Sequence, residues 1–180
     1  ITISDATRID KSQSFSVGGK ISSFAVSEDN KKLAFISRGR LFISDVKGKF
    51  VKEVNTDINE SIGEVQWLKD NKTLIFAQTQ GGYYNYYRLR ADGNNPIQFT
   101  NDTQNNRLLS FNNDQSKAVY INGRNEVRLL DLTTFTSETI VTDELWGFYN
   151  STPHFSPDDQ YVLYDAYRNF ENDIFAYHIP

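Results

Sequence analysis

The sequence predicts an all-β fold, namely a β-propeller made of four-stranded antiparallel blades. The first observation is a repeat, because four segments share an apolar residue, a polar turn with an Asp, and an apolar strand that ends in an aromatic residue. The second is that each unit carries up to four short apolar runs, a number typical of a propeller blade. The third is that no window combines helical periodicity with capping residues and sufficient length.

The repeat is regular in its spacing. In every copy the aromatic residue lies six positions after the turn Asp, and the successive Asp residues are 41, 44 and 44 positions apart. Side chains in these turns can bond to their own backbone and tolerate the left-handed conformation. The second strand of each unit is a continuous apolar run, as expected for a strand packed on both faces. The copies are Phe24–Phe35, Val65–Phe76, Leu109–Tyr120 and Pro153–Tyr164.

The repeat divides the chain into an N-terminal segment and four units. The segment is 1–17, and the predicted blades are 18–57, 58–102, 103–144 and 145–180. The last unit lacks a run for its outer strand. In one arrangement Ile1–Ser4 supplies this strand and closes a small ring, and in the other the chain is an open arc from a larger propeller. We favour the arc, because four blades lie at the small end of the known range.

Composition excludes several classes of function. The net charge of −4 and the absence of a Lys/Arg run argue against a nucleic-acid partner. No stretch approaches the roughly 20 apolar residues of a membrane span. The chain has no Cys, which excludes disulfides, thiolate metal sites and cysteine nucleophiles. It also has no Met and begins at Ile1, so we expect it to be a piece of a longer protein.

The sequence predicts no catalytic residues, no metal site and no cofactor. Its two histidines, His154 and His178, fall in different strands, and no Gly-x-Ser-x-Gly motif is present. Gly18-Gly19 and Gly81-Gly82 lack the following Lys and helix of a phosphate-binding loop. The turn Asp residues could offer calcium ligands, but a repeated turn explains them equally well and they lie too far apart to share one ion.

The candidate peptide-binding residues begin with a tyrosine cluster formed by Tyr83, Tyr84, Tyr86 and Tyr87. It lies in a hairpin that is longer than its counterparts, because the turn Asp and the third-strand Asp are 22 positions apart here and 16 and 17 positions apart elsewhere. Tyrosine offers a large contact area at a low entropy cost, which suits a peptide surface. The alternative is that two of the four rings pack between blades.

Two further candidates lie in the last unit. Trp146, Phe148 and Tyr149 precede an inner strand and could line the mouth of a channel, or plug the space between blades. Arg168 follows a second strand and could bind a peptide carboxylate with two hydrogen bonds. In the alternative interpretation, it pairs with nearby Glu171 and Asp173 at the surface.

Several motifs resemble a known family of propellers. Phe155–Tyr164, Leu89–Thr100 and Gly39–Gly48 resemble the blade repeat of TolB-like and tricorn-type propellers. Asn125–Asp131 and Asp143–Pro153 resemble more specifically the propeller of bacterial tricorn-like peptidases of family S41, and Tyr167–Phe175 adds to this likeness.

The resemblance implies an accessory domain of a multidomain serine peptidase, exported to the periplasm or cell envelope. The propeller would precede a PDZ module and a protease domain outside this chain, and its partners would be peptides or unfolded proteins. A TolB-like scaffold for protein–protein interaction with no attached enzyme is the alternative. Oligogalacturonate lyases share similar blades, but they need clustered histidines and metal ligands that this sequence lacks.

Overall fold

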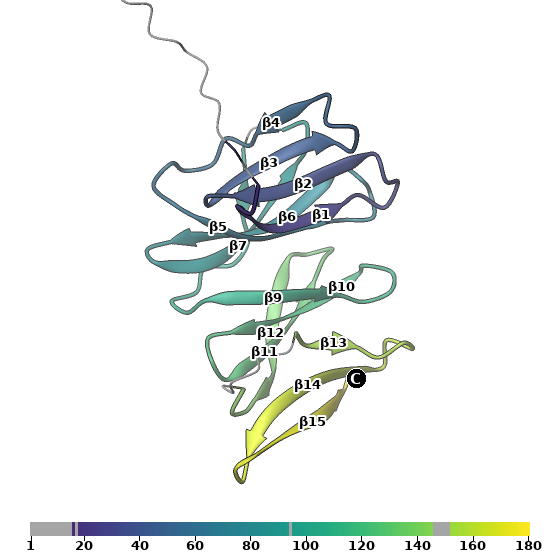
Figure 1. Ribbon diagram of the computed structural model, residues 1–180. Helices are drawn as coiled ribbons and strands as arrows, with labels where there is room; N and C mark the ends of the chain where they lie inside the picture. The colour runs from purple at the N-terminus through teal and green to yellow at the C-terminus, as the bar shows by residue number, and fades with distance from the viewer. Residues whose placement is uncertain (1–15, 17, 94, 146–151) are drawn as a thin grey trace, which may run out of the picture.

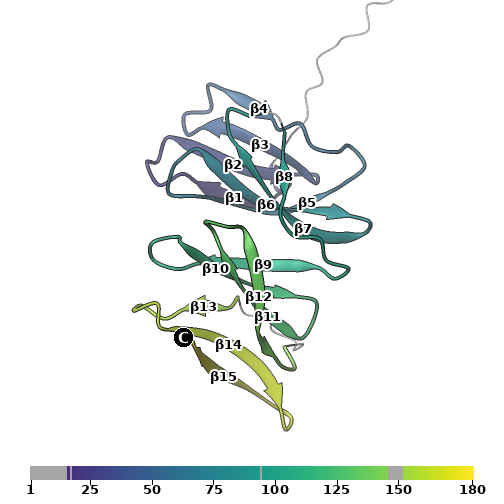
Figure 2. The ribbon, with the colours of Figure 1, turned by 180° about the vertical axis from the view of Figure 1, so that it is seen from behind.

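The computed structural model describes residues 16, 18–93, 95–145 and 152–180. All the regular elements of this part of the chain are β-strands, and they form four antiparallel sheets that follow one another along the chain. Figure 1 shows the sheets stacked from the purple N-terminal sheet to the yellow C-terminal one, and Figure 2 shows the same order from behind. No helix in the described ranges is long and apolar enough to cross a membrane.

Each sheet is a meander in which sequential strands pair. Sheet 1 contains β1 (Ile21–Val26), β2 (Lys32–Ser37), β3 (Arg40–Asp45) and β4 (Val51–Glu53). Sheet 2 contains β5 (Ile62–Trp67), β6 (Thr73–Gln80), β7 (Tyr83–Arg90) and β8 (Ile97–Gln98). Sheet 3 contains β9 (Asn106–Phe111), β10 (Lys117–Asn122), β11 (Glu126–Asp131) and β12 (Thr136–Thr142). Sheet 4 contains β13 (His154–Phe155), β14 (Tyr161–Arg168) and β15 (Glu171–His178).

The predicted all-β class is therefore confirmed. Sheet 4 has three strands in the described residues, in line with the missing fourth run of the sequence. Ile1–Ser4, the segment that could have closed a ring, lies outside the described residues. The extra residues of the second hairpin lengthen β6 and β7 to eight residues each, because the register continues without interruption from Thr73↔Arg90 to Gln80↔Tyr83.

The middle strands hold the sheets together because both of their faces are covered. Along β6, Leu74 and Phe76 pack into the core shared with sheet 1, while Ile75 and Ala77 pack into the core shared with sheet 3. This division follows from the two-residue period of a strand. Burying a large apolar side chain contributes about 1.5–3 kcal/mol, so a strand buried on both faces stabilises two junctions at once.

The turns after the first strands form a second connection between sheets. Asn71, Gln115 and Asp159 have positive φ angles of 54°, 57° and 58°. Each side chain accepts a hydrogen bond from the backbone of the preceding sheet's turn. The donors are the N–H groups of Asp29 at 2.9 Å from Asn71, Lys69 at 2.6 Å from Gln115, and Asn113 at 3.2 Å from Asp159. The repeated turn therefore serves its own hairpin and the neighbouring sheet together.

Candidate functional site

Three of the predicted binding residues, Tyr83, Tyr84 and Arg168, lie at one end of the sheets, which we call the connector end. There, the hairpin between the second and third strands of a sheet lies beside the segment that leads into that sheet. Backbone hydrogen bonds join the two in sheets 2, 3 and 4, for example from Thr79 N to Ser61 O at 2.9 Å and from Tyr167 N to Glu144 O at 2.7 Å. The other end, with the Asp turns, is called the turn end.

Tyr83 and Tyr84 lie at the connector end, where β7 begins. Tyr83 is 41% exposed. The Tyr84 ring packs over Gly63, where an added Cβ would lie only 2.8 Å from Cε1 of the ring. The backbone N–H of Tyr84 donates to Oδ1 of Asn105 at 2.9 Å, which ties the hairpin to the segment before β9. Tyr84 packs at the edge of the core between sheets 2 and 3, whereas Tyr83, the preceding residue of the same strand, directs its ring to the opposite face of sheet 2. Both rings remain candidates for peptide contact.

Tyr86 and Tyr87 are buried, so they do not form part of a peptide-contacting surface in this structure. Tyr86 is fully buried, lies edge-on to Tyr120 at 5.1 Å between ring centroids, and donates its hydroxyl to the Glu64 carboxylate. Tyr87 faces the opposite core and stacks on Phe76 at 5.8 Å. Further from the hairpin tip both faces of β7 are covered by neighbouring sheets, and this position explains the difference from Tyr83.

Glu64 is a site residue that the sequence interpretation missed. Burial raises the pKa of its carboxyl, against hydrogen bonds from Tyr86 and from the backbone of Leu108 that lower it. Burial also raises the pKa of the Tyr86 hydroxyl well above its ordinary value, and the adjacent Glu64 charge adds to this effect. A charged residue within an inner strand was the available signal, since buried acids are rare unless paired.

Leu108 and Arg107 complete this part of the connector end. Leu108 has a φ of 62°, and this left-handed backbone directs its N–H to Oε2 of Glu64 at 3.1 Å. Such a conformation is costly for a residue other than glycine and persists only when its surroundings hold it. The half-buried Arg107 donates from Nη2 to Gly123 O at 3.2 Å. No sequence pattern indicated either contact, because Leu108 bonds to a different sheet and Arg107 bonds to the turn between β10 and β11.

Arg168 forms an ion pair with Asp143 rather than with Glu171 or Asp173, so the expected surface partners were wrong. Its Nε lies 3.1 and 3.0 Å from the two oxygens of Asp143, and its guanidinium lies 4.0 Å above the Phe175 ring. The hydrogen bonds from Arg168 lower the pKa of Asp143. Asp143 is the more buried partner and precedes sheet 4, so the pair fastens the β14–β15 hairpin to the connector. Arg168 is thus engaged before any peptide arrives.

Three predicted residues, Trp146, Phe148 and Tyr149, lie outside the described residues. The histidines give no triad: His154 Nδ1 lies 3.0 Å from Ser110 Oγ, but no carboxylate in the described ranges bonds to His154. The same part of the chain contains no group of three His, Asp or Glu residues that could hold a metal ion. The turn Asp residues bond within their own turns, as Asp29 does to Ser27 Oγ at 2.7 Å.

Comparison with solved structures decides what the four sheets represent. TolB from Acinetobacter baumannii matches with a TM-score of 0.66 and 20% identity, over 89% of this chain and 41% of that protein. The fold is that of a β-propeller. A manganese complex of an oligogalacturonate lyase matches with a TM-score of 0.68 and 17% identity, over 85% of this chain and 46% of that one. A Mycobacterium tuberculosis puromycin-hydrolysing peptidase matches with a TM-score of 0.67 and 13% identity, over 88% and 27%.

These similarities establish the propeller fold and its blades. The chain spans less than half the length of each of these three proteins. Neither protein-family models nor characterised protein sequences give a match. The four sheets are therefore called blades 1 to 4 from here on.

Proposed function

We propose that this chain is a non-catalytic propeller segment of a tricorn-like S41 serine peptidase, and that it binds or guides peptides towards a protease domain outside the chain. The observation that carries the proposal is the pair Tyr83 and Tyr84, which presents aromatic side chains on the two faces of the blade 2 hairpin at the connector end. Similarity to a peptidase that contains a propeller supports it, as do the motifs Asn125–Asp131 and Asp143–Pro153.

The proposed binding surface is smaller than the set of residues that the sequence suggested. Tyr83 and Tyr84 supply contact area on a hairpin that Asn105 fixes in place. A fixed aromatic surface loses little conformational entropy on binding, which favours weak recognition of many peptides. Trp146, Phe148 and Tyr149 come between β12 and β13 in the sequence and stay proposed contributors. The proposed setting is the periplasm or cell envelope, with PDZ and protease domains of the same protein as neighbours.

The test is an NMR titration of the chain with a neutral, unstructured decapeptide of Leu, Ser and Gln residues. We expect shifts at the connector end of blades 2 and 3, and at least a threefold weaker affinity in Tyr83→Ala. Tyr161→Ala is the matched control, because Tyr161 is 38% exposed but lies on blade 4. The chain alone should not cleave the peptide. Cleavage, or equal binding by both variants, would contradict the proposal.

A TolB-like scaffold without an attached enzyme is the second candidate, and the comparable match to TolB favours it. The two candidates differ in the domains that would come after the propeller. Determination of the complete reading frame would separate them, because a PDZ module and a serine protease domain after Pro180 would exclude the scaffold. A folded protein partner that binds while the decapeptide does not would favour the scaffold.

A further inference from the structure

A groove lies between blades 1 and 2 at the turn end, opposite the proposed peptide-binding surface. Its volume is about 400 Å³, within the usual range of ligand sites. Apolar side chains from both blades line it, and three lysines stand around it. The apolar residues are Ile43, Phe50 and Ala91, and the lysines are Lys31, Lys32 and Lys72.

The apolar part of the groove combines a buried floor with an exposed wall. Ile43 belongs to the core between blades 1 and 2, whereas Phe50 is 56% exposed. The backbone around Phe50 is fixed: its N–H donates to Asp45 Oδ1 at 2.8 Å, and its carbonyl accepts from Ser44 Oγ at 2.7 Å. An exposed aromatic ring on a fixed turn is suited to an apolar anchor from a ligand.

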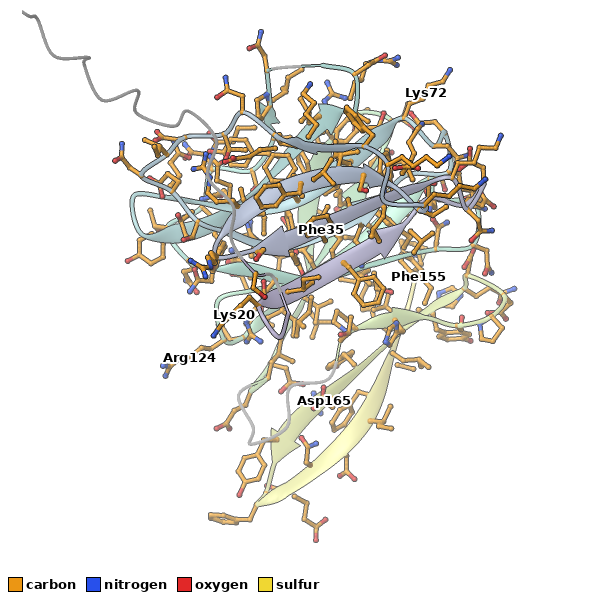
Figure 3. The ribbon with its side chains drawn as sticks, turned by 45° about the horizontal axis from the view of Figure 1, so that its top comes forward. Lys20, Phe35, Lys72, Arg124, Phe155 and Asp165 are labelled. Atoms are coloured by element: carbon orange, nitrogen blue, oxygen red, sulfur yellow. The ribbon has the colours of Figure 1, made fainter. Side chains whose placement is uncertain are left out.

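The charges around the groove favour an anionic ligand. Lys31 is 80% exposed in its side chain and has only a long contact with an acid, 4.0 Å from Nζ to Asp29 Oδ2, and Lys72 lies at the edge of the molecule in Figure 3. Lys32 is held at the junction, where its Nζ donates to Asn71 O at 2.6 Å and lies above the Trp67 ring. The two acids of the lining are engaged, Asp45 with the backbone of Phe50 and Asp92 with Arg90 at 3.1 Å.

Positive charge is concentrated on blade 1, which forms one side of the groove. Residues 18–57 contain eight Lys and Arg against five Asp and Glu, whereas residues 145–180 contain one against five. An acidic protein therefore carries its positive charge on blade 1, beside the groove. Such an asymmetry steers an anionic partner towards one region of a surface.

We propose that this groove binds an acidic peptide segment that carries one apolar anchor between two carboxylates. In an extended peptide, successive side chains point to opposite sides. A Glu-Leu-Glu segment can thus direct Leu against Phe50 and Ile43, while its flanking carboxylates reach Lys31 and Lys72 at the rim. A peptide is favoured over a long acyl chain because lysines from both blades, Lys31 and Lys72, border the apolar residues of the groove.

The test is an NMR titration of the chain with acetyl-Glu-Leu-Glu-amide. The controls are acetyl-Lys-Leu-Lys-amide, which reverses the charge, and acetyl-Glu-Gly-Glu-amide, which removes the anchor. We expect saturable shifts at Phe50, Ala91 and Lys72 with the first peptide, and binding at least tenfold weaker with both controls. Affinity should fall as salt rises, because exposed charges are screened.

Two charge-reversal variants locate the effect. Lys31→Glu with Lys72→Glu should weaken binding about tenfold, equivalent to about 1.4 kcal/mol. Lys20→Glu is the matched control, because this exposed lysine of the same blade lies outside the groove lining, and its affinity should not change. Equal binding by both variants, or by both Leu peptides, would overturn the proposal. So would a titration in which dodecanoate binds the groove and the acidic peptide does not. Failure here leaves the connector-end proposal intact, since its neutral probe needs no lysine.

Discussion

The junction between blades 1 and 2 and the junction between blades 2 and 3 are built from equivalent strand positions, but their chemistry differs. In the second junction, Asn106 donates to Thr100 Oγ1 at 3.0 Å and to Asp102 Oδ2 at 2.8 Å, and accepts from Asn122 at 2.7 Å. In the first junction, Ile62 occupies the position of Asn106, eight residues before the turn Asp. At this position the first junction therefore has an apolar side chain, whereas the second junction has a buried network of polar side chains.

Because the side chain of Ile62 cannot form hydrogen bonds, two polar side chains in the first junction lack the partner that Asn106 provides in the second. Thr56 Oγ1 and Gln78 Oε1 are buried without a hydrogen-bond partner in the part of the chain that the structure describes. Their equivalents in the second junction, Thr100 and Asn122, are both bonded to Asn106. A buried polar group without a partner costs free energy, while a complete network fixes the register of its strands. Sequence repetition therefore preserves the blade but not the way in which blades adhere.

The largest expected effect on stability comes from the apolar core of the first junction. Phe76→Ala removes a fully buried ring from the first junction and should lower the free energy of unfolding by about 3–5 kcal/mol. Urea denaturation followed by tyrosine and tryptophan fluorescence measures the change. Phe24→Ala is the control, because Phe24 is 67% exposed, and it should change stability by less than about 0.5 kcal/mol. Similar losses in both variants would show that Phe76 is not a core residue.

The next effect separates the two junctions directly. Thr100→Val removes a hydroxyl that serves Asn106 and the backbone N–H of Tyr86 at 2.7 Å, and should cost about 1–3 kcal/mol. Thr56→Val removes an unpartnered hydroxyl and should be neutral or stabilising. Thermal unfolding of both variants gives the comparison. If Thr56→Val is the more destabilising change, the two junctions do not differ as described.

The half-buried Glu64 makes the second junction sensitive to pH. Its pKa is higher in the folded chain than its ordinary value of 4.5, so the folded state holds this proton more tightly than the unfolded state. The Glu64 contribution to stability therefore rises as pH falls through the raised pKa towards 4.5, by up to about 1.4 kcal/mol per unit of pKa difference. Relative to Glu64→Gln, the wild type should gain stability as the pH falls from 7 towards 4.5. A constant difference in urea denaturation across that range would contradict the expectation.

The smallest effect concerns the surface pair of blade 4. Arg168→Gln removes an ion pair whose arginine side chain is 49% exposed, and should cost less than about 1 kcal/mol. The pKa of Asp143 is depressed in the folded chain, so this stability is present above the ordinary pKa of 3.8 and is lost as pH falls below it. Thermal unfolding at pH 7 and in 0.5 M salt should show a small loss that salt reduces. A loss that salt does not change would indicate packing on Phe175 rather than charge.

The sequence predicted those features that depend on contacts within one blade. The turn Asp residues, the apolar second strands and the aromatic residue six positions after each Asp all recur in the structure, and Phe76 and Tyr120 at this aromatic position are fully buried. These features follow from local rules of turn chemistry and strand periodicity. The same features occur in four copies of the repeat, so a copy in which the pattern is weak can be assigned by comparison with the other three.

The sequence alone determined the repeat, the strand pattern and the absence of a nucleophile motif, because each depends on residues close together in the chain. Only the tertiary structure decided which tyrosines stay exposed, which acid pairs with Arg168, and that the half-buried Glu64 bonds to blade 3. The contact between Glu64 and Leu108 spans 44 residues, and that between Arg168 and Asp143 spans 25. Such contacts depend on how blades pack, and equivalent positions such as Ile62 and Asn106 show that each junction is filled in its own way.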